Sequence, residues 1–250
     1  MIKKFYFIVL ILVFCTCEKP SDCIESTGEI ITQEYEVAAF SRIEVHRGIE
    51  LIISEGTSYK VVVQTGENLI DNVEVRQDGS ILTLKDHTSC NWVRDYGLTK
   101  VYITAPNLEE IYSKTDRNIS SNGILTFPIL KLIAFDSDAD NLPGAGTGDF
   151  IFEVNNDYME VQSNNVARFF ISGQTNLASF SIYFGDSRID CSTLIADEVV
   201  LFHRGSNDII THPITKVSGK LLSTGDLILK NNPTINLVER LFQGRIIFDF

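Results

Sequence analysis

The stretch STGDLILKNNP (residues 223–233) decides the fold, because close variants of it recur along the second half of the chain. Each variant has one or two small residues, an Asp and then a short strand-like run. The variants are GTGDFIFEVNND at 146–157, GDSRIDC at 185–191 and GSNDIITHP at 205–213. A unit that returns at a nearly constant interval predicts a repeat architecture.

Two types of strand alternate within this repeat, and LEEIYS (108–113) and LKLIAF (130–135) extend the series upstream. The first type begins near Asp149, Ala167, Asp186, Asp208 and Asp226, at intervals of 18, 19, 22 and 18 residues. The second type begins near Tyr158, Ala178, Glu198, Thr215 and Ile235, at intervals of 20, 20, 17 and 20 residues. A repeat of about 19 residues with short strands and polar turns is typical of a solenoid.

One coil of this kind is unstable alone, because both of its edges expose unpaired backbone N–H and C=O groups. Stacking the next coil about 4.8 Å away pairs these groups and closes an apolar interior. The Gly-Asp and Asn-Asp corners are expected to supply positive φ angles and local side-chain hydrogen bonds. The sequence therefore predicts an all-β fold built as a coil of β-helix.

Two other architectures have similar strand spacings. Leucine-rich repeats need a regular Leu-x-x-Leu-x-Leu pattern with Asn, which this chain lacks. Successive hairpins of a β-sandwich stay open as an alternative, because strand spacings of about 8–12 residues serve both folds.

The first half of the chain is also rich in strand signals. Residues 40–53 alternate apolar and polar side chains, and Asp78-Gly79 is a two-residue hairpin signal. A further strand is expected to end at Pro106, and no window in this half has a helical period. We therefore expect an N-terminal β-rich portion ahead of the repeats.

The N-terminus has the features of an export signal. A basic start, MIKK, precedes the ten apolar residues FYFIVLILVF (5–14), a run too short to span a bilayer as a helix. CTCEKPSDC follows, and Cys17 after the small Thr16 resembles the acylated cysteine of bacterial lipoproteins. An ordinary signal peptide with incidental cysteines is the alternative. The expected division is a signal peptide at 1–16, a polar tether at 17–34 and the β-domain at 35–250, anchored to a membrane through lipid on Cys17.

Three cysteines remain after processing at Cys17, namely Cys23, Cys90 and Cys191. Their irregular spacing does not resemble a zinc site, and an odd number permits one disulfide and one free thiol. Cys90 and Cys191 are expected to be small buried apolar residues. Which pair forms a disulfide, if any, stays open at this point.

The formal net charge is −12. Binding to duplex nucleic acid needs clustered Lys and Arg, so the acidity argues against a nucleic-acid partner. Solubility is a sufficient reason for the acidic surface.

The candidate binding residues are Trp92, Arg94, Asp95 and Tyr96, within DHTSCNWVRDYG (86–97). An exposed Trp and Tyr beside Arg and Asp can stack on a sugar ring and hydrogen-bond it. The alternative is a loop that packs over one end of the solenoid, with Trp92 as a plug.

The segment DSDADN (136–141) places Asp136, Asp138 and Asp140 at the first positions of a calcium loop. Asn141 stands where the loop needs Gly, and Thr147 where it needs Glu, so a solvated turn is the expected structure. No metalloprotease, serine-hydrolase or phosphate-loop motif occurs in the sequence. We expect neither a metal nor a cofactor.

Enzymes with β-helix folds place Asp, Arg or Lys clusters on one outer sheet. Arg188, Asp190 and Asp208 could share such a face if the coils stack in register, and paired carboxylates can perform acid–base chemistry. Chance pairs are common on an acidic surface, so an enzyme remains the alternative to a binding module.

Several motifs together resemble a known family. They are F-x-x-I-x-V-x-x-G-I-x-L-x-I-x-x-G at 40–56, CNW at 90–92, VYITAPNLEEI at 101–111 and the recurring Gly-Asp turns that end in STGDLILKNNP. They resemble the auto-transporter adhesin "head GIN" domain, which is common in exported lipoproteins of Bacteroidetes-type bacteria. The resemblance covers about residues 36–250.

The resemblance implies a right-handed parallel β-helix-like solenoid and an adhesin-like role, without catalytic residues to transfer. The turns of this chain depart from the Gly-Ser-Gly-Asp form, since they are GTGD, FGDS, GSND and STGD. We expect a lipid-anchored binding or structural module of the cell envelope, in the outer membrane. Its expected partner is a glycan or another envelope protein.

Overall fold

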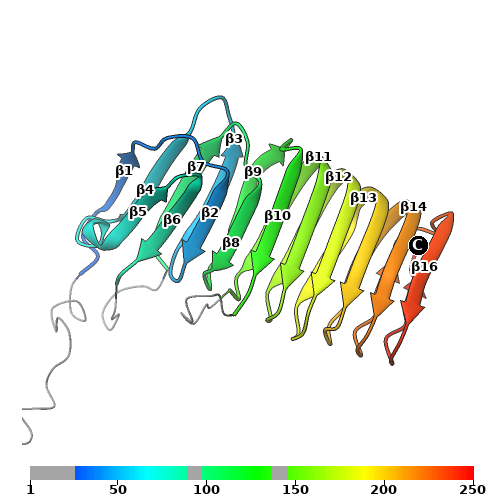
Figure 1. The fold of residues 1–250 in the computed structure, drawn as a ribbon. Coiled ribbons are helices and arrows are strands. Elements are labelled where there is room, and N and C mark those ends of the chain that lie inside the picture. Colours follow the sequence, from blue (N-terminus) through cyan, green and yellow to red (C-terminus); the bar gives the residue numbers. More distant parts are fainter. Residues whose placement is uncertain (1–25, 89–96, 137–145) are drawn as a thin grey trace, which may run out of the picture.

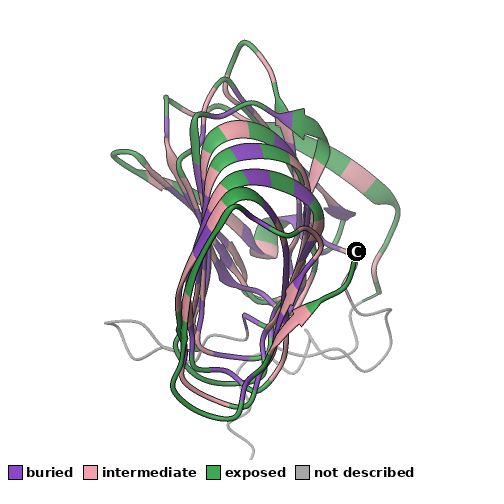
Figure 2. Cartoon of the chain, turned by 90° about the vertical axis from the view of Figure 1, so that its right-hand side faces the viewer, coloured by how far each residue is buried: buried purple, intermediate pink, exposed green. Residues whose placement is uncertain are grey.

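In a computed structural model of the chain, residues 26–88, 97–136 and 146–250 are described. They form an elongated stack of β-rungs, and the 17 strands of these residues belong to one hydrogen-bonded sheet that curls into a flattened tube (Figures 1 and 2). The helical structure in this part of the chain is one 3-10 turn, η1 (Ile70–Asn72). The all-β class predicted from the sequence is confirmed.

The first half combines parallel and antiparallel strand pairs. The antiparallel pairs are β1–β4, β4–β7 and the hairpin β5–β6, whose turn contains the predicted Asp78-Gly79. The strands are β1 (Ile30–Tyr35), β2 (Arg42–His46), β3 (Glu50–Glu55), β4 (Lys60–Gly66), β5 (Val73–Asp78), β6 (Ile81–Asp86), β7 (Lys100–Ala105), β8 (Glu110–Lys114), β9 (Ile119–Leu125) and β10 (Ile129–Ala134).

From β8 onward, every strand pair between described residues is parallel, so antiparallel hairpins of a sandwich are not present there. The strands of this half are β11 (Asp149–Ser163), β12 (Arg168–Ile182), β13 (Arg188–His203), β14 (Ile209–Leu221), β15 (Leu227–Leu229), β16 (Ile235–Arg240) and β17 (Ile246–Phe248).

The register of these parallel pairs matches the repeat length. Asp149 pairs with Arg168 and Arg168 with Arg188, while Ile209 pairs with Leu227. These partners are 19, 20 and 18 residues apart in the sequence. The two predicted strand types of each repeat are the two halves of one long, bent strand in β11, β12, β13 and β14.

The chain joins the fold earlier than the sequence suggested. Residues 30–34, which the predicted division places in the tether, form most of β1 and pair with β4. The β1 side chains are largely exposed, so their polar sequence resembles a linker although the backbone is hydrogen-bonded. Cys17 and the predicted signal peptide lie outside the described residues.

Inward-facing side chains of successive rungs form columns in a single core. Phe150 and Phe169 are paired in register with ring centroids 4.5 Å apart, and Ile189 and Ile209 continue the column. All four side chains are buried. Burying one such side chain contributes about 1.5–3 kcal/mol to the stability of the fold, so every added rung increases the stabilisation from the core.

Cys191 lies in the same core, fully buried and with a free thiol. Burial raises the pKa of this thiol well above its usual value, so it stays neutral and behaves as a small apolar residue. Its predicted burial is confirmed. Cys23 and Cys90 lie outside the described residues.

The corner glycines correct one expectation from the sequence. Gly185 has a positive φ of 93°, as expected, but Gly148, Gly205 and Gly225 do not have positive φ angles. A Cβ at Gly148 would collide with the backbone of Arg117, and one at Gly225 with the Asn207 carbonyl and the His203 ring. Most of these turns therefore need Gly because neighbouring rungs approach too closely for a side chain.

Side-chain hydrogen bonds also hold the corners, as the sequence predicted. Asn165 accepts a 2.8 Å bond from the Ala167 N–H and donates a 2.7 Å bond to the Gly146 carbonyl. The first bond holds the local turn, and the second joins it to the preceding turn.

His203 is a buried polar side chain inside this stack of corners. Its Nδ1 accepts a 3.4 Å bond from the Gly205 N–H, while its Nε2 is buried without a hydrogen-bond partner. Burial lowers the pKa of His203, and the Asn207 backbone and the nearby Asp208 and Asp226 oppose this effect only in part. The imidazole is therefore neutral in the folded chain near neutral pH.

The close approach at Gly225 gives a first prediction. Gly225→Ala should destabilise the chain by about 1–3 kcal/mol, because the new methyl group forces the adjacent turn apart. Thr224→Ala, an exposed change in the same turn, should stay within about 0.5 kcal/mol of wild type. Urea unfolding of the three proteins measures both effects, and equal midpoints for the two variants would contradict the explanation.

The environment of His203 gives a second prediction. A histidine whose folded pKa is depressed adds stability that is fully present above its unfolded pKa, about 6.5, and declines as the pH falls below it. His203→Leu should therefore reduce the loss of unfolding free energy between pH 7.5 and 5.0. Urea unfolding at the two pH values measures this loss. If His203→Leu loses as much unfolding free energy as wild type, the prediction is wrong.

Candidate functional site

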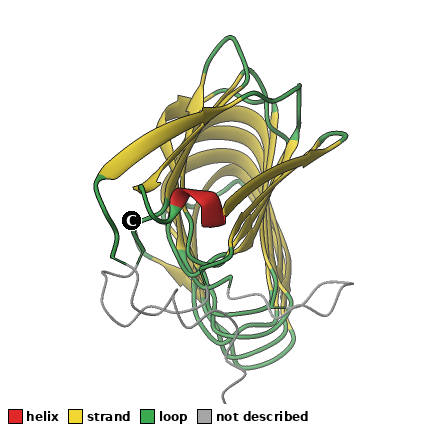
Figure 3. Ribbon diagram, turned by 90° about the vertical axis from the view of Figure 1, so that its left-hand side faces the viewer, coloured by secondary structure: helices red, strands yellow, loops and turns green. Residues whose placement is uncertain are grey.

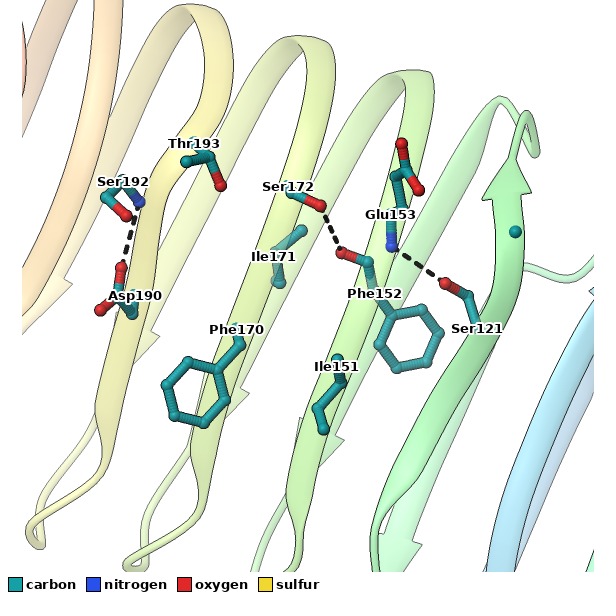
Figure 4. Close-up of a pocket in the computed structure, with 11 residues that line it drawn as sticks. Ser121, Ile151, Phe152, Glu153, Phe170, Ile171, Ser172, Asp190, Ser192 and Thr193 are labelled. Carbon is teal, nitrogen blue, oxygen red and sulfur yellow. Dashed lines mark hydrogen bonds between the residues drawn. The ribbon is translucent and has the colours of Figure 1, made fainter.

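A shallow groove of about 460 Å³ crosses the outer face of the sheet in the middle of the rod. It runs over β9, β11, β12 and β13, roughly along the direction in which the rungs stack (Figure 4). The groove is therefore made by side chains from successive repeats, which are far apart in the sequence and adjacent in space.

The floor of the groove contains apolar side chains. Ile151 and Phe170 are paired in register on β11 and β12, and both are outward-facing neighbours of buried core residues. Ile151 is 46% exposed although it is a large aliphatic side chain. Phe170 is paired in turn with Asp190 of β13. The three residues form one row across successive strands, and this row changes from apolar to acidic at Asp190.

The rim of the groove is polar. Its hydroxyl groups and carboxylates come from Ser121, Glu153, Ser172, Asp190, Ser192 and Thr193. Two of them also hold the strands: the Ser121 hydroxyl accepts a 2.9 Å bond from the Glu153 N–H, and the Ser172 hydroxyl donates a 3.3 Å bond to the Phe152 carbonyl (Figure 4). The Glu153 carboxylate is exposed.

Irregular strand pairing places these residues. The register shifts between β9 and β11 at Ile151/Glu153, and again between β12 and β13 at Phe170/Ser172. Extra residues on β9 and β13 therefore bulge out on the two sides of β11 and β12. Bulges redirect side chains and are frequent beside functional sites.

A row of charged residues runs along the rod beside the groove. It contains three inter-rung ion pairs: Asp149–Arg168, Arg188–Asp208 and Asp226–Arg245. The first is bidentate, with two N···O distances of 2.7 Å. A hydrogen bond from Arg245 holds the pKa of Asp226 below its usual value. Exposed pairs of this kind contribute about 0.2–1 kcal/mol each, so their main effect is to match one rung with the next.

The structure brings together the three residues considered for catalysis. Arg188 lies between two carboxylates, with Nη2 3.6 Å from Asp190 Oδ2 and Nη1 3.4 Å from Asp208 Oδ2. Asp190 also accepts a 3.3 Å bond from the Ser192 N–H. Both carboxylates are thus engaged in an ion-pair network at the side of the groove.

The predicted binding residues Trp92, Arg94, Asp95 and Tyr96 lie outside the described residues, as do Asp138 and Asp140 of the calcium-like segment. Asp136 is described and exposed, and its N–H donates a 2.9 Å bond to the Asn164 side chain. Within the described ranges, no three His, Cys, Asp or Glu side chains converge on a point that could hold a metal ion. In the same ranges, no helix is both long and apolar enough to cross a membrane.

The sequence contained a signal for the groove that the motif analysis missed. Strict alternation allows one apolar residue in two, but FIF at 150–152 and FFI at 169–171 have three in a row. Because neighbouring side chains of a strand face opposite ways, such a run must place an apolar side chain outside. Ile151 and Phe170 are those residues.

The chain matches one protein family over residues 39–233, described as "Putative auto-transporter adhesin, head GIN domain". The match covers most of the chain, including every strand of the groove. The chain belongs to this family. A search among curated proteins finds no match.

Solved structures of similar fold come from Bacteroides and Parabacteroides species. A "putative adhesin" of Bacteroides fragilis has a TM-score of 0.78 and 20% identity, over 90% of this chain and 100% of that one. A "putative adhesin" of Parabacteroides merdae has a TM-score of 0.66 and 15% identity, over 90% and 99%. A "putative lipid binding protein" of Parabacteroides distasonis has a TM-score of 0.62 and 13% identity, over 89% and 99%. At these identities the likeness shows the shared fold of this head GIN chain.

Proposed function

We propose that this chain is an exported, lipid-anchored binding module of the cell envelope, whose groove binds saccharide units of a glycan. The observation that carries the proposal is the combination of an exposed apolar floor with a rim of hydroxyls and carboxylates. Membership of an adhesin family supports a binding role, and the sequence of the first 17 residues supports export and lipidation.

The groove has the chemistry that a sugar ring needs. One face of a pyranose carries C–H groups that pack on an aromatic ring, which Phe170 supplies beside Ile151. The hydroxyls of the sugar can donate to the Glu153 and Asp190 carboxylates and exchange hydrogen bonds with Ser172 and Thr193. An open groove on the outer face also accepts the middle of a polymer, so several weak contacts can act together.

The parallel register of the rungs supports the finer description of the scaffold as a right-handed β-helix. Parallel connections within one sheet are right-handed in about 98% of cases. The repeat of 18–20 residues between paired positions supports the same description.

A polysaccharide-active enzyme is the second candidate, and one observation favours it. Arg188, Asp190 and Asp208 meet at the side of the groove, where a bound sugar would lie near carboxylates. Both carboxylates are paired with Arg188. This pairing favours a binding site over acid–base catalysis.

The proposal predicts that Phe170→Ala weakens glycan binding about tenfold, equivalent to about 1.4 kcal/mol, because the stacking surface is lost. Glu153→Gln should weaken binding by a smaller factor. Phe202→Ala, which removes a partly buried aromatic ring from the other half of a long strand, should leave binding unchanged. A glycan array selects the ligand, and calorimetry with the selected glycan measures the three variants.

Three results would contradict this assignment. Equal losses of glycan affinity in Phe170→Ala and Phe202→Ala would show that the groove is not the binding site. Binding of phospholipid vesicles instead of any glycan would show that the ligand is a lipid. Release of reducing sugar that disappears in Asp190→Ala and Asp208→Ala would make the chain an enzyme.

Lipidation predicts that Cys17→Ser releases the protein from the membrane. The substituted residue lacks the thiol that carries the lipid, so the chain should move to the soluble fraction of the periplasm or medium. Cys23→Ser is the matched control and should remain with the membrane. Fractionation and immunoblotting measure the distribution; a Cys17→Ser chain that stays with the membrane would place the anchor elsewhere.

A further inference from the structure

The sequence contains one Asn-Gly pair, Asn122-Gly123, near the end of β9. In such a pair the backbone nitrogen of the Gly can attack the side-chain amide of the Asn, because the Gly has no side chain to block the approach. A regular strand prevents this reaction, since it holds the backbone extended and hydrogen-bonded to its neighbours. Strands make up most of the walls of the described rod (Figure 3), so the immediate surroundings of this pair decide whether it reacts.

Neither neighbouring strand pairs with these two residues. β3 pairs with β9 as far as Ser121 and no further. On the other side, β11 pairs with Ser120 and next with Ile124, so the residues between them form a bulge. Asn122 and Gly123 therefore lie outside the ladder on both sides, within a strand that is paired before and after them.

Both residues are also exposed, and the backbone turns at the second one. Gly123 has a φ of 93°, in the left-handed region, and a Cβ built on it would have no neighbour within 4 Å. The Asn122 amide donates a 3.2 Å bond to the hydroxyl of Ser54, and this contact lies at the exposed surface. Water therefore reaches the pair, and the backbone has room to turn at Gly123.

We propose that Asn122 deamidates spontaneously in the folded chain. The Gly123 nitrogen gives its proton to water and forms a bond to Cγ of Asn122. The bond between Cγ and Nδ2 breaks, and Nδ2 takes up a proton and leaves as ammonia. The cyclic succinimide that results adds one water molecule. Opening on one side gives aspartate, and opening on the other gives isoaspartate, in which the backbone runs through the former side-chain carbon.

The reaction changes the edge of the groove. Ser121 and Gly123 both line it, and the Ser121 hydroxyl accepts the 2.9 Å bond from the Glu153 N–H (Figure 4). Isoaspartate adds one carbon atom to the backbone between Ser121 and Gly123, so the bulge lengthens and this edge moves. Aspartate adds a negative charge next to Ser54, whose hydroxyl can donate to it. The effect on ligand binding rests on the function proposed above for the groove, whereas the reaction itself does not.

Mass spectrometry of the full chain tests the reaction. The folded protein is kept in mildly alkaline buffer at body temperature, and its tryptic peptide 118–131 is followed with time. A synthetic peptide of the same sequence, treated in the same way, gives the rate without a fold. Conversion of Asn122 in the folded chain should be within about tenfold of the peptide rate, because the pair needs no unfolding in order to react.

Asn118 is a control within the same peptide, and it is also exposed. The β-branched Ile119 follows it, and this residue is buried and paired with Leu51 and Phe150. Asn118 should therefore remain unconverted in the folded chain. A folded-chain rate at Asn122 below about a tenth of the peptide rate would show that the strand protects the pair, and would overturn the proposal. Equal conversion at Asn118 and Asn122 would also overturn it.

Calorimetry with the selected glycan measures the effect on the groove. In aged wild type, the fraction of molecules that bind should fall by the fraction that carries isoaspartate. Asn122→Gln aged in the same way should bind like fresh wild type, because its longer side chain does not form the succinimide. Freshly prepared Asn122→Asp should also bind normally, because it adds the charge without lengthening the backbone.

Two further outcomes separate this proposal from the proposed function. Aged wild type that contains isoaspartate and binds as well as fresh protein would show that the reaction does not alter the groove. Fresh wild type that binds no glycan would contradict the proposed function, and the conversion measured at Asn122 would be unaffected by that result.

Discussion

Every rung of this chain leaves two rows of backbone N–H and C=O groups that only a neighbouring rung can pair. An unpaired buried amide or carbonyl is costly, so the polypeptide is stable only as a stack. The inward columns, such as Phe150 over Phe169, and the inter-rung ion pairs, such as Asp149 with Arg168, depend on this stacking. Each of these contacts is made between residues about one repeat apart, never within one strand.

The regular part of the fold could be predicted from the sequence, since it follows from periodicity. Asp208 and Asp226 are separated by the same number of residues as the paired positions Ile209 and Leu227. The two intervals agree because each Asp directly precedes its strand at the same place in the repeat. Alternation along DFIFEV likewise indicates which side chains are inside. These features are local or periodic, and a single sequence displays both.

The irregular parts could not be obtained in the same way. Tertiary contacts decide that residues 30–34 pair with β4, and nothing in their polar composition reveals it. The need for Gly at positions 148 and 225 depends on the distance to the next rung, which the sequence does not contain. The groove depends on register shifts beside Ile151 and Phe170. The triplets FIF and FFI indicate that some apolar side chain faces outward, but not that two of them meet.

The direction of the ladder hydrogen bonds has a mechanical consequence. In a stack of parallel strands these bonds run along the length of the rod, whereas the strands run across it (Figure 1). Tension applied between the two ends is then shared, at any cross-section, by all the bonds of one rung at once. A hairpin pulled open from its ends breaks its bonds one after another, and peeling the final turn off the rod breaks bonds in the same sequential way. This chain therefore resists lengthwise pulling far better than peeling from its final turn.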